Sequence, residues 1–235
     1  MPEDILFSGA AELGINLSKD AAFAFREYYN LLEEKNRVMN LTSISGENIT
    51  RLHFLDSLAL LPMFNFTDSS VIDIGSGAGF PGMPIRLADP TIRLTMLDAQ
   101  QKRIGFLSEL CIRTGCADVK CIKARAEEAA LLPEMRESFD FAVSRAVARL
   151  CVLVELCLPF VRTGGALLAM KSTGADEETA GAKNAIKILG GKLENEIDYS
   201  VPGTDVIHRV VVIRKTAVTP KGYPRRFAKI QKSPL

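Results

Sequence analysis

The sequence contains no long apolar run. No segment of its 235 residues approaches the ~20 consecutive apolar residues that a membrane-spanning helix needs. The acidic N-terminal stretch MPEDILFSGAAELG also lacks the basic region and apolar core of a secretory signal peptide. These two absences predict a cytoplasmic protein that has no membrane partner.

Histidine is scarce, and the cysteines form no metal-binding motif. There are two histidines, His53 and His208, and five cysteines without a Cys-x-x-Cys pair. Zinc sites need clustered cysteine and histidine ligands, so we predict no metal site. An odd number of cysteines without a signal peptide favours reduced thiols that pack in the core, although two disulfides would also fit the count. We interpret His208 as structural, and His53 as either a buried histidine or a base acting on RNA.

The composition fits one compact domain with a sizeable core, because 47% of the residues are hydrophobic and 24% are charged. The net charge is only +1, but it is distributed unevenly. Residues 1–70 carry five Lys/Arg and ten Asp/Glu, whereas residues 206–235 carry eight Lys/Arg and no acid. A basic end on a nearly neutral body is typical of a protein that binds a polyanion, and a tail that only aids solubility would give the same count.

The first 66 residues have the spacing of amphipathic helices. Apolar side chains recur at helical intervals at Phe23, Tyr28, Leu31, Leu32 and Val38. Ser18 precedes this run and can cap the start of the helix. No glycine-rich linker follows, so residues 1–66 are predicted to form a helical extension packed on the main domain.

Strand and helix patterns alternate from Val71 onwards. Strands are predicted at residues 71–74, 92–99, 119–124, 139–146 and 164–172. Helices are predicted at residues 81–90, 101–115, 149–161 and 176–190. This alternation is typical of an α/β fold with a doubly wound, mostly parallel sheet, here residues 67–215. Residues 192–201 and 208–215 follow each other without a helix, which predicts a terminal antiparallel hairpin before a basic tail at 216–235.

The stretch VIDIGSGAGFPG, residues 71–82, is an apolar strand that breaks into a glycine loop. Gly77, Gly79 and Gly82 satisfy the pattern G-x-G-x-x-G, and Gly75 permits a sharp turn at the end of the strand. A loop of this kind between a strand and a helix lets a nucleotide-like ligand approach the backbone closely. We therefore predict a nucleotide-like cofactor at this loop.

The charges near the loop favour S-adenosylmethionine over a dinucleotide. Asp73 lies two residues before Gly75 and would oppose a pyrophosphate, whereas S-adenosylmethionine carries an ammonium and a sulfonium. Asp98 ends the next strand, where an acid can accept both ribose hydroxyls of either ligand. Ala126 and Glu127 follow the third strand, where an adenine edge would lie. Taken alone, Glu127 fits a solvated charge at a helix start better.

Nine short motifs follow one another along nearly the whole chain. They are NLTSI (40–44), HFLDSL (53–58), DIGSGAGFPGMPI (73–85), LDAQQKRIGFL (97–107), RAEE (125–128), SRAVA (144–148), LLAMKS (167–172), YPRR (223–226) and KSPL (232–235). With this ordered set the sequence resembles the bacterial 16S ribosomal RNA guanine-N7 methyltransferases, the RsmG family, formerly called GidB.

The resemblance implies a class I S-adenosylmethionine-dependent methyltransferase fold with a Rossmann-like sheet. It also implies transfer of a methyl group to N7 of one guanine in 16S rRNA, position 527 in the 530 loop. The partner would be 16S rRNA, the 30S subunit or an assembly intermediate, and a monomer is expected. By position, Gly75 and Phe80 would lie in the cofactor loop with Asp98, Ala126 and Glu127. Arg145 would face the methyl donor or the target base.

The chain departs from the family pattern at three places. Ala99 and Ser172 stand where the family often has Ser and Gly, and FAKIQ (227–231) stands where a Gly-x-Pro is common. The third departure weakens the RNA-contacting role of the tail.

The sequence is consistent with methylation of guanine N7 mainly because it lacks the motifs of other base methylations. Guanine N7 has a free lone pair and needs no general base, only alignment with the methyl donor. The sequence has neither an Asn/Asp-Pro-Pro-Tyr/Phe motif nor a cysteine beside a proline. Arg145 is therefore predicted to hold the base, for example at O6, or else to form an ion pair with a nearby acid. Predicted RNA contacts, beside the aromatic residues Tyr223 and Phe227, are Lys102, Arg103, Lys171, Arg225, Arg226 and Lys229.

Three other functions fit parts of the pattern. A methyltransferase acting on a small molecule or a protein would share the loop, but not the basic tail. A non-catalytic RNA-binding module would not need the intact Asp73, Gly75, Gly77, Gly79 and Asp98. A NAD-dependent oxidoreductase is disfavoured by Asp73. A titration with S-adenosylmethionine separates the last two from a methyltransferase.

Overall fold

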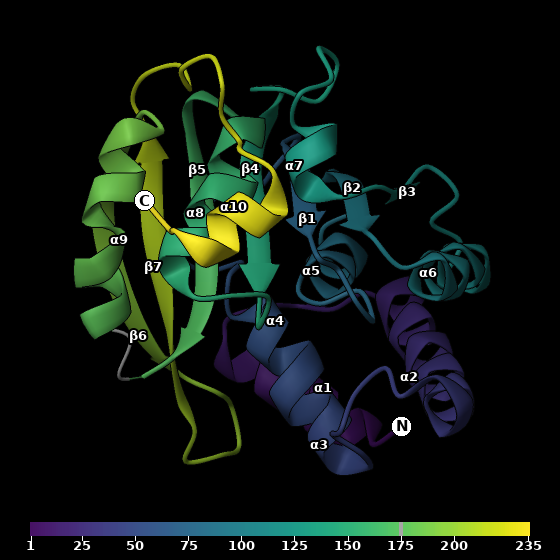
Figure 1. Ribbon diagram of the computed structural model, residues 1–235. Helices are drawn as coiled ribbons and strands as arrows, with labels where there is room; N and C mark the ends of the chain where they lie inside the picture. Colours follow the sequence, from purple (N-terminus) through teal and green to yellow (C-terminus); the bar gives the residue numbers. More distant parts are fainter. Residues whose placement is uncertain (174–175) are drawn as a thin grey trace.

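A seven-stranded sheet between two layers of helices forms the body of the computed structural model, which describes residues 1–173 and 176–235 (Figure 1). The strands are ordered β3-β2-β1-β4-β5-β7-β6 across the sheet. Their bounds are β1 Ser70–Ile74, β2 Arg93–Asp98, β3 Lys120–Lys123, β4 Phe139–Arg145, β5 Val161–Ser172, β6 Gly191–Ser200 and β7 Ile207–Lys215. Pairings along the sheet are parallel except those of β7, which runs antiparallel to both β5 and β6.

The helices divide between the two faces of this sheet. One face is covered by the longer helices α1 Glu3–Glu12, α2 Lys19–Met39, α5 Gly82–Ala88 and α6 Gln101–Arg113, and by the short α3 Glu47–Ile49, π-helical Thr50–Leu55 and α4 Asp56–Leu58. The other face is covered by α7 Ala126–Ala129, α8 Leu150–Cys157, the 3-10 turn Leu158–Phe160, α9 Asp176–Ile188 and α10 Phe227–Lys232. Each face of the sheet packs against its helices in a separate hydrophobic core. Successive side chains of a strand point to opposite faces, so Leu168 of β5 packs in the first core and Leu167 in the second.

The predicted alternation of strands and helices and the terminal hairpin are confirmed. Ser18 caps α2 as expected, since its hydroxyl accepts the Ala21 N–H at 3.0 Å. Tyr28 is buried on the inner face of α2, but Phe23 and Val38, which share its apolar pattern, are 51% and 80% exposed and do not lie on that face. The physical reason is helical geometry: Phe23 lies five residues before Tyr28, about 140° around the helix.

The N-terminal helices share their core with the sheet, and Figure 1 shows them beside the end at which β4 terminates. Tyr28 is fully buried, and its hydroxyl donates a 2.5 Å hydrogen bond to the carbonyl of Ala78 in the glycine loop. A Cβ at Gly79 would lie 2.6 Å from that hydroxyl oxygen. Gly79 is therefore required for close approach of α2, and the extension helps to fix the shape of the loop.

The chain after β7 is also folded onto the body. Arg136 donates hydrogen bonds to the carbonyls of Thr219, Pro220 and Tyr223. In Figure 1 the final helix α10 lies in front of α8 and the sheet. Throughout the described ranges, no helix has both the length and the apolarity to cross a membrane.

Candidate functional site

Two adjoining cavities open at the carboxyl ends of β1 and β4. The larger, about 970 Å³, is lined by residues from the α2–α3 segment, the glycine loop and β4, β5 and β7. The smaller, about 180 Å³, is lined by residues that follow β2 and β3 and by α10. Gly75, Arg103 and Val147 line both cavities. The chain reverses its strand order between β1 and β4, which is where open α/β sheets bind ligands.

The glycine loop forms the boundary between the cavities. Gly75 and Gly77 have φ values of 70° and 59°, in the left-handed region that favours glycine. A Cβ at Gly75 would lie 2.7 Å from a methyl group of Val147, whereas one at Gly77 would meet only a backbone oxygen at 3.8 Å. The loop therefore turns tightly at Gly75 and leaves open space at Gly77.

Asp73 lies behind this loop and lines neither cavity. One of its carboxylate oxygens accepts the Gly82 N–H at 3.0 Å, and the other is buried without a hydrogen-bond partner among the described residues. Burial raises the pKa of Asp73 to about 7. Asp73, predicted as a cofactor-binding residue because its charge favours a cationic ligand, is therefore not placed for a direct ligand contact. Asp73 can act on a ligand only through its charge across the loop.

Asp98 lines the smaller cavity at the end of β2. One carboxylate oxygen accepts the Gly77 N–H at 3.0 Å and pairs with Arg103 at 3.2 Å, and the other accepts the Gln100 N–H at 2.8 Å. These bonds tie the glycine loop to the start of α6. Arg103 is therefore paired with Asp98, whereas Lys102 is exposed, and the RNA contact predicted for each stays a prediction.

Ala126 and Glu127 line the same smaller cavity, and Glu127 is only 8% exposed. This burial contradicts the alternative reading of Glu127 as a solvated charge. Phe227 of α10 also lines the cavity and packs against the second core. Its predicted role in stacking on RNA stays a prediction, and its place in this cavity was not predicted, because nothing in the local sequence indicates that the chain end returns to the β2–β3 edge.

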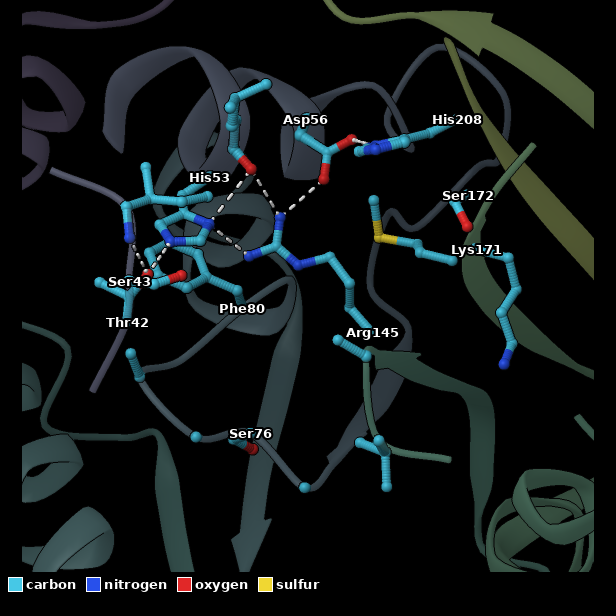
Figure 2. Close-up of a pocket in the computed structure, with 18 of the residues that line it drawn as sticks. Thr42, Ser43, His53, Asp56, Ser76, Phe80, Arg145, Lys171, Ser172 and His208 are labelled. Atoms are coloured by element: carbon cyan, nitrogen blue, oxygen red, sulfur yellow. Dashed lines mark hydrogen bonds and ion pairs between the residues drawn. The ribbon is translucent and has the colours of Figure 1, made fainter. Parts of the chain in front are cut away.

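Arg145 ends β4 and points toward the N-terminal helices (Figure 2). One terminal guanidinium nitrogen lies 2.6 Å from Asp56 Oδ2 and 3.0 Å from the Leu52 carbonyl, and the other lies 2.8 Å from His53 Nδ1. The guanidinium carbon lies 5.0 Å from the centre of the Phe80 ring. The ion pair considered for Arg145 is therefore present, and the side chain still lines the larger cavity.

Phe80 is enclosed by other rings. Its ring stacks against Tyr28 at 5.2 Å and against His53 at 4.4 Å, measured between centroids. Phe80 lines the larger cavity but cannot offer a free face to a ligand. It supports the residues around it.

Asp56 is fully buried and joins distant parts of the chain. Besides Arg145, it accepts hydrogen bonds of 2.7 Å from the Tyr199 hydroxyl and from His208 Nδ1. Burial alone would raise the pKa of Asp56, but the His208 hydrogen bond and the Arg145 charge outweigh it, and the net shift is downward. Burial, together with the Arg145 charge, lowers the pKa of His53 to about 3, so His53 is neutral and a poor base.

The predicted RNA contacts separate into two groups. Arg226 and Lys229 are exposed. Lys171 lines the larger cavity, but its ammonium donates to the Ala148 carbonyl at 2.6 Å and pairs with Glu178 at 2.8 Å. Arg225 forms a 2.6 Å ion pair with the fully buried Glu155, so the prediction that it contacts RNA is not supported.

No group of three or more potential metal ligands occurs among residues 1–173 and 176–235. The sulfurs of Cys111 and Cys121 lie 3.7 Å apart as thiols. Asp56, Tyr199 and Thr42 were missed as site residues, since neither spacing nor charge in the sequence connects them. His208, expected to be structural, belongs to the same network.

Comparison with known proteins identifies close relatives. A family model described as rRNA small subunit methyltransferase G matches residues 22–200. The curated "Ribosomal RNA small subunit methyltransferase G" of Acetivibrio thermocellus is 41% identical over 98% of this chain and 96% of its own length. The protein of the same name from Pelotomaculum thermopropionicum is 44% identical over 97% and 96%, respectively.

Solved structures of methyltransferases share the fold at low sequence identity. A Pyrococcus furiosus methyltransferase matches with a TM-score of 0.57 and 13% identity, covering 83% of this chain and all of that one. M. jannaschii TYW2, solved in complex with AdoMet, matches with a TM-score of 0.55 and 15% identity, covering 73% and 76%. The predicted class I methyltransferase fold is thereby confirmed.

The buried Arg225–Glu155 pair generates a stability prediction. Replacing Arg225 with Ala leaves the buried Glu155 carboxylate without the guanidinium that neutralises it, so we expect the free energy of unfolding to fall by about 3 kcal/mol. The matched variant Arg226→Ala removes an adjacent exposed cation and is expected to change it by less than about 0.5 kcal/mol. Urea unfolding of both variants measures the difference. Equal effects would contradict the structural assignment of Arg225.

Proposed function

The chain belongs to the rRNA small subunit methyltransferase G family, and from this premise we propose that it transfers a methyl group from S-adenosylmethionine to N7 of a single guanine in 16S rRNA. By resemblance to the family, the target is position 527 in the 530 loop. The observation that carries the proposal is the pair of cavities that meet at Gly75 and Val147. One has the side chains for an adenosine, and the other is large enough for a base beside it.

The residues present fit S-adenosylmethionine. Asp98 would accept the ribose hydroxyls, and Ala126 and Glu127 would border the adenine in the smaller cavity. The methionine part of S-adenosylmethionine would lie along Gly75 and Gly77, in front of the buried Asp73. An unpartnered carboxylate oxygen there favours a cation and opposes a pyrophosphate. This supports S-adenosylmethionine over a dinucleotide.

The reaction asks little of the side chains beyond alignment. S-adenosylmethionine, when bound, supplies a sulfonium methyl group that can pass to the N7 lone pair while sulfur keeps the electrons of the broken bond. Guanine N7 carries no proton, so no base is needed. The site is consistent with this: the pKa of His53 is about 3, and Asp56 is fully engaged with Arg145, Tyr199 and His208. Arg145 would hold the base in the larger cavity, and proximity would supply much of the rate.

Exposed cations near the cavities would bind the RNA backbone. Lys102, Arg226 and Lys229 are exposed and free to meet phosphates, which predicts salt-dependent binding. Lys171 would act at the edge of the larger cavity rather than on the backbone. We propose that the protein works as a monomer in the bacterial cytoplasm, on 16S rRNA within a 30S subunit or its precursor.

Transfer of labelled methyl from S-adenosylmethionine to 16S rRNA tests the proposal. We expect one N7-methylguanine in the 530 loop, mapped by chemical cleavage, when naked rRNA and 30S subunits are compared. The preferred substrate shows when the enzyme acts during assembly. Cofactor binding without transfer to either RNA would overturn the rRNA assignment and favour a small-molecule or protein substrate.

Phe227 is expected to contribute to cofactor affinity. Replacing Phe227 with Ala removes an apolar wall from the smaller cavity, so the Kd for S-adenosylmethionine should rise about tenfold, a value typical of a lost aromatic contact with a base. Isothermal titration calorimetry measures this without RNA. Phe227→Leu should retain most of the affinity, and Phe23→Ala, at an exposed position on α2, should leave it unchanged. An unchanged Kd for Phe227→Ala would show that α10 is not part of the cofactor site.

Asp73 makes cofactor binding depend on pH. With a pKa of about 7, its carboxyl group is mostly protonated at pH 5.5. A cationic ligand lowers that pKa and so releases a proton on binding. Affinity for S-adenosylmethionine should therefore rise with pH, by about tenfold between pH 5.5 and 7.0, below the range in which an α-ammonium titrates.

Calorimetry of Asp73→Asn over the same pH range provides the control. The amide cannot ionise, so we expect weaker binding with little dependence on pH. A slope equal to that of the wild-type protein would assign the titration to another group.

A further inference from the structure

Thr42 is held rigidly at the edge of the larger cavity, which it lines. Its backbone N–H donates to the Asn36 side-chain oxygen at 2.9 Å, and its carbonyl accepts from the Asn36 amide nitrogen at 2.8 Å. Its hydroxyl oxygen accepts the Ile44 N–H at 3.0 Å and lies 2.7 Å from His53 Nε2. Both the backbone and the side chain of Thr42 are therefore fixed in place.

The direction of the His53 hydrogen bond follows from Arg145. A guanidinium can only donate, and one of its terminal nitrogens lies 2.8 Å from His53 Nδ1. Nδ1 must therefore be the unprotonated ring nitrogen that accepts. Nδ1 also lies 3.1 Å from the Leu52 carbonyl oxygen, but that oxygen already accepts a hydrogen bond from Arg145 and does not need Nδ1 as a second donor. A neutral His53 with its hydrogen on Nε2 is the tautomer that satisfies these contacts, in agreement with the lowered pKa of His53.

This tautomer determines what the Thr42 hydroxyl can do. The Nε2–H donates to Thr42 Oγ1, and the Ile44 N–H donates to the same oxygen. Both lone pairs are then used, so the hydroxyl hydrogen must point elsewhere. Its hydrogen finds no acceptor within residues 1–173 and 176–235. The hydroxyl is thus a fixed donor at a cavity wall.

We propose that the Thr42 hydroxyl donates a hydrogen bond to O6 of the target guanine and so helps the site to distinguish guanine from adenine. This inference rests on the proposed function. The edge of guanine that carries N7 also presents O6 as a second acceptor, whereas adenine presents an amino donor at the same place. Thr42 and Arg145 both contact His53 and both line the cavity, so an adenine amino group placed there would face the Thr42 hydroxyl hydrogen rather than an acceptor.

The test compares guanine with 2-aminopurine at the target position of the RNA substrate. This base keeps N7 and the 2-amino group but has no O6. Single-turnover methyl transfer is measured on both RNAs for wild type, Thr42→Val, Thr42→Ser and Ser45→Ala. The ratio of the two rates reports on O6, because any misfolded fraction lowers both rates equally and the different reactivity of the two bases cancels between variants.

We expect the guanine preference to fall about tenfold in Thr42→Val, which is the effect of losing one hydrogen bond to a bound substrate. Thr42→Ser keeps the hydroxyl and should retain the preference within about twofold. Ser45 is exposed and lines neither cavity, so Ser45→Ala should behave as wild type. S-adenosylmethionine affinity of Thr42→Val, measured by calorimetry, should be unchanged.

Two results would overturn the proposal. An unchanged ratio in Thr42→Val, with both rates reduced, would make Thr42 a purely structural residue. Loss of the preference in Thr42→Ser as well would show that the hydroxyl is not the source of recognition. Absence of methyl transfer to guanine by the wild-type protein would instead remove the proposed function, and this inference with it.

Discussion

The arrangement of the site depends on one buried carboxylate, that of Asp56. It is fully buried and bonds to Arg145 from β4, Tyr199 from β6 and His208 from β7. The charge of Arg145 would otherwise stand uncompensated beside the buried Phe80 ring, at a cost of several kcal/mol. The carboxylate therefore fixes Arg145. Arg145 in turn fixes the tautomer of His53, and His53 fixes the hydroxyl of Thr42.

A network of this kind suits a reaction that transfers no proton. The ion pair between Asp56 and Arg145 is internally neutral, and His53 stays uncharged over the physiological pH range because its pKa is about 3. The donors of Arg145, His53 and Thr42 therefore keep the same pattern as the pH changes. What the site can contribute is placement of two reactants, and fixed donors achieve this without reorganising during the reaction.

The elements that could be predicted from the sequence are those whose position follows from strand order. Asp98 ends β2, and Ala126 and Glu127 follow shortly after the parallel strand β3, so topology alone brings them to one edge of the sheet. Asp56 meets its partners across 143 and 152 residues, and no local pattern encodes such a contact. The same limit explains Phe227, whose place in the smaller cavity depends on how the chain end folds back.

The basic C-terminal region shows how a charge count can mislead. Several of the eight cations in residues 206–235 are neutralised by acids of the body: Arg214 pairs with Glu194, Lys215 with Glu137 and Arg225 with Glu155. The count therefore overstates the field that a polyanion would meet. The exposed cations Arg226 and Lys229 lie on or next to α10, the helix that supplies Phe227 to the smaller cavity. The cationic surface and the smaller cavity, which we propose as the cofactor site, are thus contiguous, because one short helix contributes to both.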